Sequence, residues 1–71
     1  MSFSEYKEEI KRLFFKGLIG EMLIDAQRYF NTNEAQEKIK QDYEYYISKD
    51  EMLEGAAQPE AVANCLNLMW D

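Results

Sequence analysis

Apolar residues near the start of the chain recur every three or four positions, which is the period of an α-helix. They lie within an arc of about 100° around a helix axis: Phe3, Tyr6, Ile10, Leu13 and Phe14. Ser2 and Glu5 have the spacing of a capping box, in which two first-turn backbone donors find acceptors. Glu8 and Arg12 have the spacing of an i, i+4 ion pair. We therefore predict an amphipathic helix at the start of the chain.

The apolar stripe changes direction between Gly17 and Gly20. On a continuous helix, the apolar residues that follow lie roughly opposite to the first stripe: Leu18, Ile19, Met22, Leu23, Ala26, Tyr29 and Phe30. A straight helix would have to face two partners at once. Glycine inside a helix costs up to about 1 kcal/mol relative to alanine, which favours a break at this point. The alternative is one continuous helix over residues 3–30, in which Gly17 and Gly20 let a neighbouring element approach closely.

Turn and capping residues at 31–33 separate this second segment from a third one. The third segment has a narrow apolar face: Ala35, Ile39, Tyr43, Tyr46 and Ile47. Glu34 and Glu37 come early in it, where carboxylates suit the positive end of the helix dipole. A second capping-box spacing begins at Ser48, so we expect the helix to end near Lys49.

The last helical pattern begins at Pro59, because proline suits the first position of a helix. Its apolar residues cover more than half of the helix circumference: Ala61, Val62, Cys65, Leu66, Leu68 and Met69. A helix with so little charge must bury most of its surface, either in its own core or against another chain.

These segments predict an all-α fold, a small bundle of three to four short helices. Strict alternation of apolar and polar residues, the pattern of a half-buried strand, does not occur in the sequence. We expect one helical domain over residues 1–71, with short connections that favour antiparallel neighbours. A chain of 71 residues buries only about 60% of its unfolded surface, so we expect a marginal stability.

The net charge of −6 comes from the last part of the chain. Residues 1–20 have a balance of +1 and residues 21–40 a balance of −1, whereas residues 41–71 have a balance of −6. A patch of one sign attracts and selects partners of the opposite sign. A charge of this size also keeps a small domain soluble, which is the simpler explanation.

The composition argues against an enzyme. Histidine is absent, and with it the commonest general base and the commonest metal ligand. Cys65, the chain's one cysteine, lies on the apolar side of its helix and is expected to be a buried thiol. The spacing of Asp50, Glu51 and Glu54 does not match a calcium-binding loop. We expect no catalytic site, no cofactor and no metal.

Nucleic acid and membrane are also disfavoured as direct partners. The sequence pI is about 4.5, and phosphate contacts need a concentrated basic face. The longest uncharged stretch, residues 61–70, is far shorter than the roughly 20 residues that span a bilayer. The start of the chain lacks the pattern of a signal peptide. Taking the chain as complete, we expect a cytoplasmic protein.

One tyrosine has no place in the predicted core. Tyr43 and Tyr46 share the apolar face of the third helix, whereas Tyr45 lies roughly opposite to it. An exposed tyrosine among carboxylates is typical of a binding hot spot. The candidate protein-binding residues are Asp42, Tyr45, Lys49, Asp50, Glu51 and Glu54.

The end of the last helix is a second candidate surface, for self-association. Its residues are Leu66, Met69 and Trp70. An apolar chain end left in water is unfavourable. Trp70 is therefore expected either to fold back onto the bundle or to close the interface of a homodimer.

We expect a non-enzymatic protein-binding module, a small acidic inhibitor that docks on a basic protein surface, such as that of a nucleic-acid-binding protein. Immunity proteins, antitoxins and inhibitors encoded by phages or mobile elements are of this kind. In charge, size and the adjacent Tyr45 and Tyr46, the chain resembles the colicin-nuclease immunity proteins, and this resemblance implies adjacent tyrosines at the interface. The alternative is a structural homo-oligomer or assembly subunit that uses the last helix as its interface.

Overall fold

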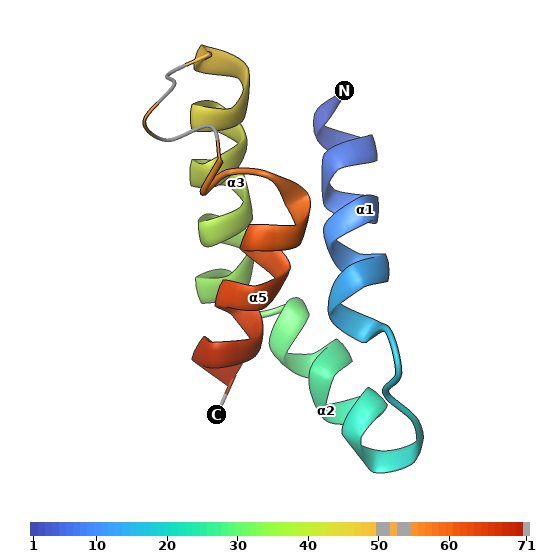
Figure 1. Cartoon of the computed structure of the whole chain (residues 1–71). Helices are drawn as coiled ribbons and strands as arrows, with labels where there is room; N and C mark the ends of the chain where they lie inside the picture. The colour runs from blue at the N-terminus through green and yellow to red at the C-terminus, as the bar shows by residue number, and fades with distance from the viewer. Residues whose placement is uncertain (50–51, 53–54, 71) are drawn as a thin grey trace.

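The computed structural model describes residues 1–49, 52 and 55–70. Within these residues the chain forms four helices and no strand (Figure 1): α1 (Phe3–Phe15), α2 (Gly20–Phe30), α3 (Asn33–Ser48) and α5 (Pro59–Trp70). α1 contacts each of the other three helices and packs most extensively against α5. The prediction of an all-α fold built as a small helical bundle is confirmed.

The start of α1 follows the sequence pattern. The backbone N–H of Glu5 donates to Ser2 Oγ at 3.2 Å, and the backbone N–H of Ser2 donates to the Glu5 carboxylate at 3.3 Å. These contacts form the predicted capping box, and the bond from the Ser2 backbone lowers the pKa of Glu5. The predicted ion pair is wrong in its partner, because Arg12 pairs with Glu9 rather than Glu8. The predicted pair has an i, i+4 spacing and the observed pair an i, i+3 spacing, and side chains at either spacing are neighbours on a helix.

The break between the first two helices lies where the apolar stripe changes direction. Gly17 has φ 80° and Gly20 has φ 61°, in the left-handed region that glycine adopts without a steric penalty. A Cβ atom at either position would meet nothing within 4 Å, so the backbone conformation alone selects glycine. The predicted break is therefore confirmed, and the alternative of a continuous helix with a closely approaching neighbour is wrong.

The core lies along α1 and receives side chains from all the described helices. Its buried members are Tyr6, Ile10, Phe14, Ala26, Phe30, Ala35, Ile39, Val62, Ala63 and Leu66. Tyr43 and Tyr46 pack against this cluster, as predicted, with ring centroids 5.1 Å from that of Tyr6. The apolar residues of helix periodicity thus supply most of the core.

Six residues of the predicted apolar stripes are exposed instead: Phe3, Ile19, Met22, Ile47, Leu68 and Met69. Ile19 is 81% exposed, Met22 is 58% exposed and Ile47 is 55% exposed. Ile19 lies in the break before α2, where helix periodicity does not apply. Met22 lies in the first turn of α2, which extends beyond the end of α1 (Figure 1), and Ile47 lies in the last turn of α3. Near helix ends an apolar position need not have a neighbour to pack against.

Tyr6 joins α1 to the connection that precedes α5. Its side chain is fully buried, and its hydroxyl donates a hydrogen bond to the backbone carbonyl of Ala57. Burial raises the pKa of this hydroxyl above its ordinary value, and the nearby Asp42 and Tyr46 raise it further. The neutral hydroxyl is thus the form that the fold requires.

Replacing Gly17 with alanine should destabilise the protein without creating a steric clash. We expect Gly17→Ala to lower the free energy of unfolding by roughly 1–2 kcal/mol, because an L-residue in the left-handed region carries that cost. Gly55 has no positive φ, so Gly55→Ala is the matched control. Urea unfolding followed by circular dichroism measures both variants, and equal stability of the two would contradict the argument.

Replacing Tyr6 with phenylalanine should change both the stability and its dependence on pH. At neutral pH we expect Tyr6→Phe to cost about 1–3 kcal/mol, because the Ala57 carbonyl loses its donor. The raised pKa means that the unfolded chain loses this proton first, so wild-type stability should fall as the pH rises above about 10.

Tyr6→Phe should flatten that decline without abolishing it, because burial also raises the pKa of Tyr29. Denaturant unfolding between pH 8 and pH 11 provides the measurement. Tyr45→Phe alters an exposed tyrosine and is the control. An unchanged slope in Tyr6→Phe would show that Tyr6 does not cause the decline.

Candidate protein-binding surface

α3 buries one side and exposes the opposite side along its whole length. Thr32 begins the helix by accepting a hydrogen bond from the backbone N–H of Ala35 at 3.3 Å, and Lys49 ends it with φ 60°. With Ala35 and Ile39 in the core, the exposed residues opposite them lie within an arc of about 100°: Glu34, Glu37, Gln41, Glu44, Tyr45 and Ser48. We call these six residues the acidic face of α3.

The acidic face of α3 holds three carboxylates, and no cation is among its six residues. Lys40 lies at one edge of this face and is exposed. Lys38 lies at the other edge, where its ammonium is 2.9 Å from the Asp42 carboxylate. Because Lys38 is already paired, it neutralises Asp42 rather than the glutamates.

The structure places the predicted binding residues in three different settings. Tyr45 is 37% exposed and lies opposite the apolar face of α3, as predicted. Lys49, which directly follows the last residue of α3, is also exposed. Asp42 is only 6% exposed, which contradicts its prediction as a surface residue. It comes three residues after Ile39 and therefore shares the buried side of the helix. The other predicted members, Asp50, Glu51 and Glu54, lie outside the described residues.

Sequence reasoning missed Glu34, Glu37 and Glu44 as members of the surface that contains Tyr45. The first two were assigned only to the helix dipole. A helical projection of the side opposite to the apolar face would have found them, because Glu37 and Glu44 are seven residues apart and Glu34 is eleven residues before Tyr45, and both spacings are close to whole numbers of turns.

The end of α5 divides the predicted self-association residues. Leu66 is fully buried and Trp70 packs on Phe14, with ring centroids 5.7 Å apart. The half-buried Trp70 therefore folds back onto the bundle, which is one of its two predicted outcomes. The buried Leu66 is not available to a second chain, so its prediction as a self-association residue is wrong. Met69 is 38% exposed, and its neighbour Leu68, which the prediction omitted, is 81% exposed.

The apolar residues of α5 that are not fully buried form a stripe along one side of that helix, apart from Trp70. Its residues are Ala61, Cys65, Leu68 and Met69, at positions i, i+4, i+7 and i+8. Ala61 and Cys65 are half-buried, whereas Leu68 and Met69 are exposed. We call these four residues the apolar stripe of α5.

The acidic face of α3 and the apolar stripe of α5 lie on neighbouring helices. α3 and α5 contact each other and run in opposite directions (Figure 1). α3 turns Tyr43 toward the rings of Phe3 and Tyr6 on α1. Since successive helix residues are about 100° apart, Lys38 and Asp42 lie on the other edge of α3, toward α5. Lys38 thus separates the acidic face from the apolar stripe.

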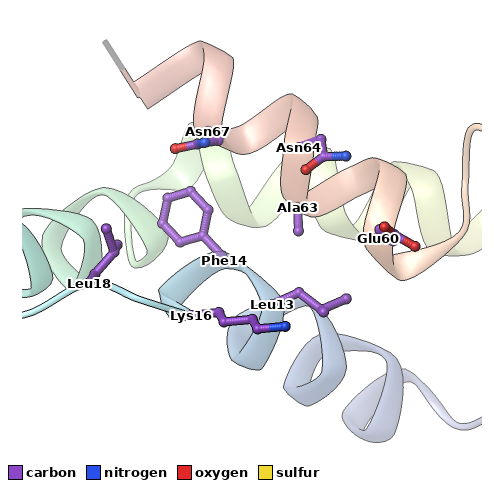
Figure 2. A pocket seen from close by; sticks show the side chains of 8 residues that line it. All are labelled: Leu13, Phe14, Lys16, Leu18, Glu60, Ala63, Asn64 and Asn67. Atoms are coloured by element: carbon purple, nitrogen blue, oxygen red, sulfur yellow. The ribbon is translucent and has the colours of Figure 1, made fainter.

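A cleft of about 250 Å³ lies on the opposite side of α5, against α1. Figure 2 shows its lining: Leu13, Phe14, Lys16, Leu18, Glu60, Ala63, Asn64 and Asn67. Phe14 and Ala63 supply apolar surface, and the carboxamides of Asn64 and Asn67, one helical turn apart, form part of its polar rim. The charged residues of its lining are Lys16 and Glu60.

Metal chemistry has no evident site in the part of the chain that the structure describes. There, no three or more carboxylate and cysteine side chains are grouped so that they could hold a metal ion. Among the same residues, no helix has both the length and the apolar character needed to cross a membrane.

Comparison with protein-family models, curated proteins and solved structures finds no match to this chain. Its function must therefore be argued from its own residues.

Two neighbouring leucines on α5 should respond differently to the same substitution. Leu66→Ala should lower the free energy of unfolding by about 2–5 kcal/mol, because it leaves a cavity in the core. Leu68→Ala should change it by less than about 0.5 kcal/mol, because its side chain is already in water. Thermal unfolding followed by circular dichroism measures both. A large loss in Leu68→Ala would show that the end of α5 packs differently.

Proposed function

We propose that this chain is a non-enzymatic protein-binding module that docks on a basic protein surface through the acidic face of α3 and so blocks that surface. The observation that carries the proposal is that Glu34, Glu37 and Glu44 lie on the same exposed side of α3 as Tyr45, with Lys40 at its edge and Lys38 paired with Asp42. Carboxylates steer a basic partner toward the helix, and a tyrosine supplies rigid contact area once it arrives.

The spacing of the carboxylates supports a nucleic-acid-binding protein as the partner. At 1.5 Å per residue, Glu34 to Glu44 spans about 15 Å, so the three glutamates are on average about 7.5 Å apart. One strand of DNA carries a phosphate every 3.4 Å or so. The face therefore offers about half of that linear charge density, which suits a surface built to contact phosphates.

A pair of variants with equal net charge tests the proposal. Glu37→Lys with Glu44→Lys reverses the acidic face of α3, whereas Glu21→Lys with Asp25→Lys makes the same change on α2. Each purified protein is immobilised and incubated with lysate of the native host, and bound proteins are identified by mass spectrometry. We expect the wild type and the α2 variant to capture a basic protein that the α3 variant binds at least about tenfold more weakly.

Repeating the capture at about 0.5 M salt should release that protein, because screening shortens the range of charge interactions to a few ångströms. An equal loss of binding in both double variants would mean that only the net charge matters. Undiminished binding by the α3 variant would show that the acidic face of α3 is not the docking surface. Circular dichroism of each variant confirms that the helices are retained.

A further inference from the structure

The apolar stripe of α5 leaves surface in water that the core does not use. Leu68 is 81% exposed and Met69 is 38% exposed, although both belong to the least charged of the four described helices. From Ala61 to Met69 the stripe is about 12 Å long, at 1.5 Å per residue. A stripe of this length matches two turns of another helix.

The stripe is shaped for a helix rather than for an extended peptide. Ala61 and Cys65 are small and half-buried, so they form a low region beside the projecting Leu68 and Met69. An amphipathic helix binds such a surface by placing its own apolar residues at i, i+3, i+4 and i+7. Addition of a β-strand requires a sheet edge, and the described residues contain no strand.

The charge next to the stripe selects what covers it. The acidic face of α3 lies beyond Lys38, and Lys38 is paired with Asp42. The described residues of α5 itself carry one charge, that of Glu60. A second copy would bring another net charge of −6 toward this surface, and like charges repel across an interface. A positively charged partner is attracted by the same negative charge.

We infer that the α3–α5 side of the molecule binds a basic amphipathic helix. The apolar side of that helix covers the apolar stripe of α5, and its lysines or arginines lie over the acidic face of α3. This inference rests on the proposed function, since it names the structural element by which the basic partner docks. It adds a contact, the apolar stripe, that the proposed function does not require.

Two synthetic peptides of lysine and leucine test the inference on the whole chain. In one, about 14 residues long, the leucines follow helical spacing and form a single apolar side. The other has the same composition in an order that spreads the leucines around the helix. Affinity is measured by fluorescence anisotropy, and the rate at which iodoacetamide alkylates Cys65, the one thiol of the chain, reports whether the stripe is covered.

The helically spaced peptide should bind more tightly than its permuted form and should protect Cys65, whereas the permuted peptide should leave Cys65 reactive. Leu68→Ser with Met69→Ser should weaken the helically spaced peptide by at least about tenfold, because two apolar contacts are lost. The same change should leave the permuted peptide unaffected. Glu37→Lys with Glu44→Lys should weaken both peptides.

Equal affinity of the two peptides with a reactive Cys65 would overturn the inference and leave the proposed function standing. If reversal of the acidic face changed neither peptide's affinity, the basic character of the partner, and with it the proposed function, would fail. Slower alkylation of Cys65 at higher protein concentration without peptide would show that a second copy covers the stripe. That result would also overturn the inference.

Discussion

The burial of Tyr6 ties together three parts of the chain that are far apart in sequence. Its ring packs against Tyr43 and Tyr46 of α3, and its hydroxyl donates to the carbonyl of Ala57 before α5. A buried hydroxyl is tolerated only with a partner, so this bond fixes where the chain approaches α1 before it enters the last helix. The side of α5 that enters the core, and the side left outside, both follow from that position.

A core of this size cannot cover every apolar side chain of the bundle. Ala26, Ala35 and Ala63 let the helices approach closely, while Tyr6 and Phe14 fill the centre. Most of the apolar residues that remain exposed lie near helix ends or along the apolar stripe of α5, and Ile24 in the middle of α2 is exposed as well. Contiguous exposed apolar surface is typical of interaction sites. The same limited core thus accounts for both the stability expected of the fold and the apolar surface on which the proposed docking rests.

The acidic character of the chain is organised by pairing as much as by composition. Asp42 is withdrawn from the surface and neutralised by Lys38, while Glu34, Glu37 and Glu44 remain in water. A buried carboxylate needs a close cation, whereas exposed carboxylates are solvated by water and stay available to a partner. The proposed binding surface therefore contains only some of the acidic residues, and the orientation of α3 determines which ones.

Local patterns in the sequence determined the helices, because caps, breaks and periodicity act within a few residues: Ser2 with Glu5, Gly17 with Gly20, and Pro59 are all where they were expected. Tyr45 was also correctly placed outside, since only one side of α3 is apolar. The tertiary structure decided which members of each stripe are covered. Leu66 is buried and Leu68 exposed, and Asp42 is buried and Glu44 exposed, because burial depends on which neighbouring helix lies opposite. That is a long-range property that no local pattern contains.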